Sequence, residues 1–117
     1  MLVSAKLLYA FMCFVGVHTL VWFASNSQFI SEAWKEKSFW VMIALSVPIS
    51  LLMYYGTRFG YEALNDSAWG VRLFAYGTSY LTFPLLTWLL LDESMFTAKT
   101  LLCILLSIAI ILIQVFL

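Results

Sequence analysis

Long apolar runs, separated by short polar breaks, divide the chain into four segments. A helix that spans a membrane needs about 20 mainly apolar residues, and each of the four runs meets this requirement. The stretches Asn26–Lys37 and Asp92–Ser94 carry several charges and are predicted to be water-exposed turns. The pattern therefore predicts transmembrane helices at residues 6–25, 38–64, 69–91 and 98–117.

The polar triplet Asn65-Asp66-Ser67 decides where the second helix ends. The apolar run ends near Tyr55, but the residues that follow include aromatic side chains that are unusual in a loop. Asp66 or Ser67 can accept hydrogen bonds from the free N–H groups of a third helix, which favours a turn here. A helix over residues 38–64 would be about 40 Å long, more than the ~30 Å hydrocarbon core. Its last turns are therefore expected to enter the headgroup layer, unless the helix tilts.

The composition supports the same interpretation, since 64% of the residues are hydrophobic and 10% are charged. Soluble domains are nearer half apolar and a quarter charged. We therefore predict an all-α membrane protein with short loops, a single domain over residues 1–117 that crosses the cell (inner) membrane several times and has the lipid bilayer as its partner. The six basic and six acidic residues cancel, and the balance excludes nucleic-acid binding.

Three charges flank the predicted turn at residues 65–68: Arg58, Glu62 and Arg72. Arg58 and Glu62 are one helical turn apart, and Glu62 and Arg72 fall at nearly the same height on two antiparallel helices. This spacing predicts a three-member ion-pair layer with Glu62 between the two arginines. One interpretation makes these residues interfacial anchors whose stems reach toward water. The other gives them a role in substrate binding or gating.

Polar side chains inside the spans supply two further candidates. His18 lies near the middle of the first helix, where it is either a proton relay or a neutral side chain hydrogen-bonded to a neighbouring helix. Tyr76, Ser79 and Tyr80 are spaced at three and four residues on the third helix. Their common face is too polar for lipid, so it is expected to line a cavity or to contact a partner.

Glycines mark the expected helix contacts, because a residue without Cβ lets two backbones approach closely. They are Gly56 and Gly60 on the second helix, and Gly70 and Gly77 on the third.

Catalytic chemistry finds no support in the sequence. The sequence has no paired carboxylates within a span, no nucleophile–base spacing, no metal-ligand cluster and no glycine-rich phosphate loop. We expect no enzyme activity, no cofactor and no bound metal.

The basic residues do not define an orientation. Four spans put both termini on one side, with Lys6, Arg58 and Arg72, and leave three lysines, Lys35, Lys37 and Lys99, on the other. The positive-inside rule normally gives a clear asymmetry. This balance is expected of a chain that inserts in both directions and pairs with itself antiparallel, and equally of a chain whose orientation is set by a partner.

The last 40 residues resemble the small multidrug resistance family and the wider drug/metabolite transporter superfamily. The run from Gly77 to Ser94 is similar to the third helix of that superfamily's repeat, with an acidic turn at Asp92-Glu93, and Ala98–Leu117 matches its closing apolar helix. The resemblance implies the fold of a four-helix transporter more than a particular substrate. Four helices can barely enclose a pathway, so a transporter of this size is expected to work as a dimer.

The departures from this family concern the substrate. The family's exporters carry a glutamate in the first helix, where this chain has Phe14 and Val15, with His18 one turn later. Arg72 stands where an aromatic residue is expected. Two arginines near a cavity mouth suit an anionic or phosphate-bearing solute better than a drug cation.

Two functions therefore remain open. The first is a small transporter, or a subunit of one, that works as a homodimer and carries a small-molecule substrate past Arg58, Glu62, Arg72, Tyr76 and His18. The second is a non-transporting accessory or structural membrane subunit, with the polar face of the third helix as its contact. A cavity between helices that contains His18 or Arg72 is expected for the first function, and a packed interior for the second.

Overall fold

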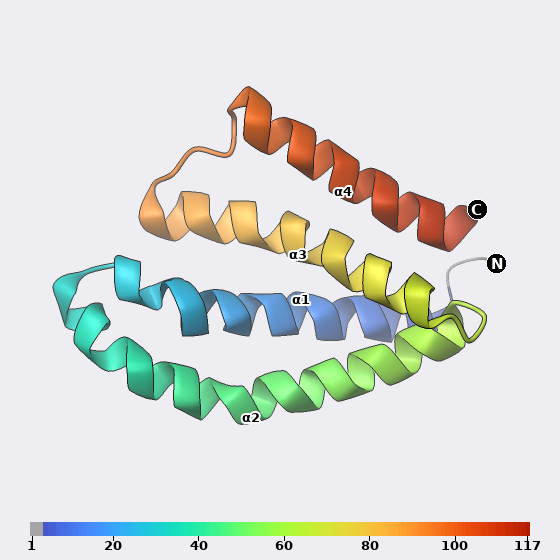
Figure 1. The fold of residues 1–117 in the computed structure, drawn as a ribbon, viewed down its shortest axis with the longest axis horizontal. Coiled ribbons are helices and arrows are strands. Elements are labelled where there is room, and N and C mark those ends of the chain that lie inside the picture. Colours follow the sequence, from blue (N-terminus) through green and yellow to red (C-terminus); the bar gives the residue numbers. More distant parts are fainter. Residues whose placement is uncertain (1–3) are drawn as a thin grey trace.

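The computed structural model describes residues 4–117, which form four long helices and one 3-10 turn and contain no strand (Figure 1). All four helices are long and apolar enough to cross a membrane. The predicted class, an all-α membrane protein with four transmembrane helices and short loops, is confirmed; residues 1–3 of the predicted domain lie outside the described part. The elements are α1 (Ala5–Asn26), η1 (Ser27–Phe29), α2 (Glu32–Ala63), α3 (Ala68–Leu91) and α4 (Ala98–Phe116).

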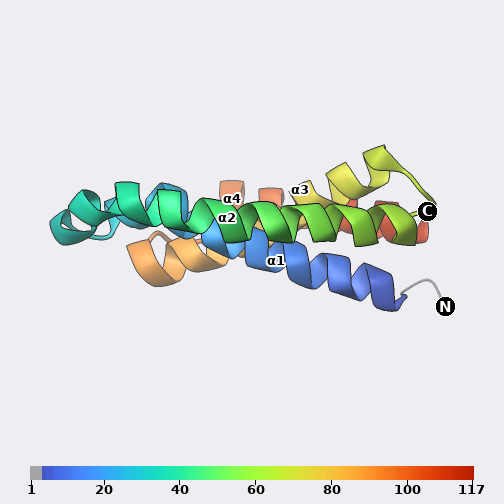
Figure 2. The same ribbon diagram turned by 90° about the horizontal axis from the view of Figure 1, so that it is seen from below.

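The four helices lie side by side in one layer, in the order α2, α1, α3, α4 (Figure 1). The view from below shows how thin this layer is (Figure 2). Its principal extents are 47 × 35 × 19 Å. A helix with its side chains is about 10–12 Å across, so the short dimension holds fewer than two helices. The two outer helices are therefore packed on one side only.

The buried core lies at the end of the layer that contains the start of α1 and the α2–α3 turn. Its α1 members are Leu7, Ala10 and Phe14, and α3 contributes Val71 and Phe74. α1 is central to this core because it packs against both α2 and α3. At the opposite end of the layer the buried residues include Trp22, Ser27 and Thr87.

Each helix begins with a hydroxyl side chain that accepts a hydrogen bond from the N–H three residues further on. The four caps are Ser4, Ser31, Ser67 and Thr97. Such caps satisfy one of the free N–H groups at the start of a helix. Ser67 is one of the two residues predicted to cap the third helix.

α2 begins at Glu32, six residues before the predicted start at residue 38. The prediction that Asn26–Lys37 is a turn is therefore wrong for its second half. Ser31 caps the helix, and Glu32 in the first turn interacts favourably with the helix dipole. The charged residues that suggested a loop are the exposed side chains of a helix that continues beyond the hydrocarbon core.

The other end of α2 agrees with the prediction. The helix ends at Ala63, one residue from the predicted end at Leu64. Asn65 and Asp66 follow in the left-handed region, with φ of 59° and 57°, which these two residue types tolerate better than most. α2 has 32 residues and is about 48 Å long. It is bowed in Figure 1 and contains Pro48 in its middle.

Two glycines of α2 lie where this helix meets its neighbours. A Cβ added to Gly56 would come 3.0 Å from the Cβ of Cys13 on α1, and one added to Gly60 would come 2.5 Å from Cγ2 of Val71 on α3. Both distances are too short for an ordinary contact. Because Gly56 and Gly60 have no side chain, α1 and α3 can approach α2 closely at these positions.

The glycines of α3 lie toward α4. A Cβ added to Gly77 would come 2.7 Å from Cγ1 of Ile111 and 3.0 Å from the carbonyl oxygen of Ser107. At Gly70 the neighbours of such an atom are Ser67, at 3.2 Å, and Gln114, at 3.4 Å. At Gly77, α3 and α4 are therefore so close that a larger residue would not fit without a shift of one helix.

Candidate functional site

A groove of about 480 Å³ runs over α1 between α2 and α3. α1 lies between the other two helices in the layer (Figure 1), so the side chains of α2 and α3 form the groove's two sides. The groove is lined by Phe14, Val17, His18, Val21, Met53, Thr57, Ala68, Val71, Arg72, Ala75, Tyr76 and Ser79. It therefore brings together three predicted site residues: His18, Arg72 and Tyr76.

Arg72 is held by the residue one turn later on α3. Its Nη2 donates a hydrogen bond to the hydroxyl oxygen of Tyr76, at 2.9 Å. Its guanidinium carbon also lies 4.8 Å from the centroid of the Tyr76 ring, within the range of a cation–π contact. No carboxylate among residues 4–117 forms an ion pair with Arg72. The groove therefore contains a positioned positive charge that no acidic side chain neutralises.

His18 lies on the face of α1 that forms the floor of the groove. Its Nε2 is 3.0 Å from the carbonyl oxygen of Ala75 on α3. Because a carbonyl can only accept, Nε2 carries a hydrogen in this bond, and Nδ1 remains available to accept a hydrogen bond or a proton. The His18 ring is also stacked on Phe14, with centroids 6.5 Å apart. The hydrogen bond to a neighbouring helix, one of the two alternatives considered for His18, is present.

The predicted ion-pair layer of Arg58, Glu62 and Arg72 is wrong. The one ion pair within residues 4–117 joins Glu62 Oε2 to Lys6 Nζ, at 2.9 Å. The prediction assumed that Glu62 faces α3, whereas the first turn of α1 supplies its partner. Both side chains remain partly exposed, Lys6 at 56% and Glu62 at 38%, so this is a surface pair.

Arg58 and Glu62 lie outside the groove. They line a second hollow of about 410 Å³ on α2, which shares only Met53 and Thr57 with the groove. The five predicted substrate or gating residues therefore form two groups, one in the groove and one beside it.

Several lining residues of the groove were not predicted. Thr57 and Met53 on α2 are the clearest examples. The sequence contained a partial signal, because Thr57 lies next to the predicted packing residue Gly56. Their role depended on α1 lying between α2 and α3, which the pattern of apolar runs does not specify.

The polar face predicted for α3 is divided between two cavities. Tyr76 and Ser79 line the groove, whereas Tyr80 lines a cavity between α3 and α4. A spacing of three and four residues places side chains on one side of a helix. Here that side is wide enough to reach two neighbouring helices.

The groove combines a charged side chain, hydrogen-bonding groups and an apolar lining. Arg72 supplies charge, His18, Thr57 and Ser79 supply groups that form hydrogen bonds, and the remaining lining is mostly apolar. No group of three or more metal-ligating side chains occurs within residues 4–117. Cys13 and Cys103 are both free thiols.

Searches against protein-family models, curated proteins and solved structures found no match for this chain.

Proposed function

We propose that this protein is a subunit of a small transporter in the cell (inner) membrane, and that it carries a small anionic or phosphate-bearing solute. One observation supports this proposal above the others. Arg72 is the one permanently charged side chain among the described residues that line the groove, and it has no acidic partner. The Arg72 side chain is exposed, so its guanidinium is free to pair with an anion that enters the groove.

The groove suits a solute with one anionic group and an apolar body. Arg72 would bind the anion through its guanidinium, which presents several N–H donors to a carboxylate or phosphate. The hydrogen bond from Arg72 to Tyr76 orients the guanidinium before the solute arrives. His18 lies on the floor of the groove, with its Nε2 hydrogen-bonded to the carbonyl oxygen of Ala75. Its Nδ1 is the atom that would exchange a proton with the solute or with water.

A second copy of the chain would complete the pathway. A single layer 19 Å thick leaves the groove open along one broad face. A permeating anion would there meet lipid directly, at a high free-energy cost. We therefore propose a homodimer in which the partner covers this face.

Transport by reconstituted protein tests the proposal. Vesicles that contain the full chain are expected to take up radiolabelled benzoate, phenyl phosphate or inorganic phosphate faster than empty vesicles. Arg72→Gln should lower this uptake by roughly tenfold or more, because one charge-assisted hydrogen bond contributes about 1.5–3 kcal/mol. Arg58→Gln is the matched control, since it removes an arginine from the neighbouring hollow.

Three outcomes would contradict the proposal. One is uptake of none of these anions by folded protein. Another is an equal loss of uptake in Arg72→Gln and Arg58→Gln. The third is a preference for tetraphenylphosphonium, a lipophilic cation, over every anion.

The alternative function, an accessory subunit of a larger membrane complex, is favoured by the exposed outer helices. Little of either α2 or α4 is buried within the chain, and both carry large apolar side chains on their outer faces. Lipid or a protein partner would cover these faces equally well. Copurification of a defined larger assembly from membranes, together with absence of anion uptake, would support this function.

A further inference from the structure

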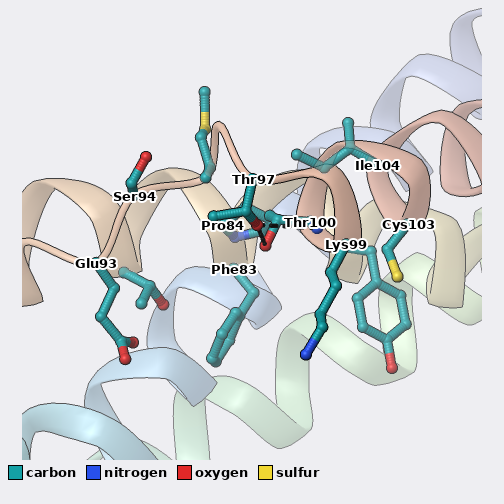
Figure 3. Close-up of a pocket in the computed structure, with 12 residues that line it drawn as sticks. Phe83, Pro84, Glu93, Ser94, Thr97, Lys99, Thr100, Cys103 and Ile104 are labelled. Carbon is teal, nitrogen blue, oxygen red and sulfur yellow. Dashed lines mark hydrogen bonds between the residues drawn. The ribbon is translucent and has the colours of Figure 1, made fainter.

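A third cavity, of about 420 Å³, opens between α3 and α4 at the end of the layer where the two helices are connected (Figure 3). We call it the α3–α4 crevice; it is lined by Tyr80, Phe83, Pro84, Glu93, Lys99 and Cys103, among others. The two helices diverge from their close contact at Gly77 toward the connecting loop (Figure 1). The crevice lies at this diverging end of the helix pair.

The rim of the crevice carries two opposite charges that do not pair with each other. Glu93 lies in the loop, and Lys99 lies in the first turn of α4. Figure 3 shows both side chains extending to the same side, with Phe83 between them. Neither forms an ion pair with any residue from 4 to 117. A ligand that carries both a negative and a positive group could contact both side chains.

The crevice lies at the level of the lipid headgroups. The loop after α3 contains Asp92, Glu93 and Ser94, which cannot lie in hydrocarbon. Beside it, Trp88 and Phe96 form an exposed edge-to-face pair with ring centroids 5.3 Å apart. Aromatic residues of this kind are concentrated at membrane–water interfaces. The charged rim is therefore in the headgroup layer, and the apolar interior faces the start of the acyl chains.

We propose that the α3–α4 crevice binds a phospholipid whose headgroup carries a primary amine, with phosphatidylethanolamine as the ligand. Lys99 pairs with the lipid phosphate, and the carboxylate of Glu93 accepts hydrogen bonds from the ammonium group. The first carbons of an acyl chain lie against Phe83, Pro84 and Ile104, which line the apolar part. This site is separate from the groove and does not depend on the proposed transport function.

The two charges predict a clear order among lipids. Phosphatidylcholine keeps its positive charge but lacks N–H donors, so it loses the hydrogen bonds to Glu93. Phosphatidylglycerol has no positive group at all and leaves Glu93 facing a phosphate. We therefore expect phosphatidylethanolamine to bind more tightly than either lipid of the same acyl composition.

Cys103 provides a readout in the unaltered chain, because this free thiol is exposed and lines the crevice. The rate at which N-ethylmaleimide labels Cys103 is measured in detergent micelles with each of the three lipids. At ten times its Kd, phosphatidylethanolamine should slow labelling roughly tenfold, since about one tenth of the crevices remain empty. Labelling of Cys13, which lies between α1 and α2, should not change.

Two variants assign the contacts. Lys99→Gln should weaken phosphatidylethanolamine binding by roughly tenfold, the loss expected for one charge-assisted hydrogen bond. Glu93→Gln should remove most of the preference for phosphatidylethanolamine over phosphatidylcholine and phosphatidylglycerol. Lys37→Gln and Glu36→Gln are the matched controls, because they remove exposed charges from the start of α2 at the same end of the layer.

The proposal is overturned by equal protection of Cys103 by all three lipids, or by an equal effect of Lys37→Gln and Lys99→Gln. It is also overturned if water-soluble glycerophosphoethanolamine protects as well as the lipid, because the site would then recognise a free headgroup and not a membrane lipid. The labelling comparison uses the unaltered chain, so it decides the question even if a variant does not fold.

Discussion

At the scale of single residues, the most informative contact is the hydrogen bond between Trp22 and Thr87. The indole Nε1 of Trp22 on α1 donates to Oγ1 of Thr87 on α3, at 2.9 Å, and both residues are buried. Lipid cannot replace the lost partner of a buried N–H group. This contact fixes α1 against α3 near the end of the layer that lacks the main core.

We predict that Thr87→Val destabilises the protein by roughly 1 kcal/mol, the usual range for a hydrogen bond between membrane helices. Trp22→Phe should cost more, because it also removes buried volume. The double variant should lose less stability than the sum of the losses in the two single variants. Reversible unfolding in mixed micelles measures all three. Strict additivity would show that the hydrogen bond contributes nothing.

At the scale of elements, the tightest contact between α3 and α4 is at Gly77. Gly77 of α3 faces Ile111 and the carbonyl of Ser107 on α4, with no space for a methyl group. The rest of α4 is largely exposed. The absence of a side chain at Gly77 therefore sets how closely these two helices can approach.

We predict that Gly77→Ala destabilises the α3–α4 pair by about 1–3 kcal/mol, the cost typical of overpacking. Gly16→Ala is the control, because the added methyl group meets only the flexible end of Leu52, at 3.2 Å. In that variant, the gain in helix propensity should offset most of the strain. Both free energies are measured by unfolding in mixed micelles. Equal effects of the two substitutions would show that Gly77 is not a special contact.

Local turn chemistry marks both the start of α3 and the start of α2, but only the first was predicted. The restart at Ser67 follows from polar residues adjacent in sequence. The early start of α2 was missed, because the charged residues before position 38 were interpreted as a loop and the Ser31 cap was not recognised. The partner of Glu62 was missed for a different reason. Lys6 is 56 residues away in sequence, and only the order of helices in the layer brings the two together.

At the scale of the whole molecule, the layer has one broad face with a groove and no cover of its own. His18, Arg72 and Tyr76 could be predicted as candidates from their polarity within apolar helices. Their assembly in one groove could not, because it depends on α1 lying between α2 and α3. The same arrangement leaves the groove open on one face, which the proposed second copy of the chain would cover.

We predict that the protein is a homodimer in bilayers, with subunits in opposite orientations. Single cysteines at Asn65 and at Ser94, which lie at opposite ends of the layer, are placed in a chain that lacks Cys13 and Cys103. With a membrane-impermeant reagent, each should be labelled about half from either side of a sealed vesicle, as the balanced charges suggest. Labelling of each cysteine from one side only would exclude the antiparallel dimer. A monomeric mass in lipid nanodiscs would exclude any dimer.

The ion pair between Lys6 and Glu62 limits how many times the chain between them can cross the membrane. Two side chains 2.9 Å apart must emerge on the same side, so the polypeptide between them crosses an even number of times. The contact therefore shows that the number of crossings is even without any use of hydropathy. The contact does not depend on which way the chain is oriented in the membrane. A chain threaded from either side forms it equally, so both members of an antiparallel pair would keep it.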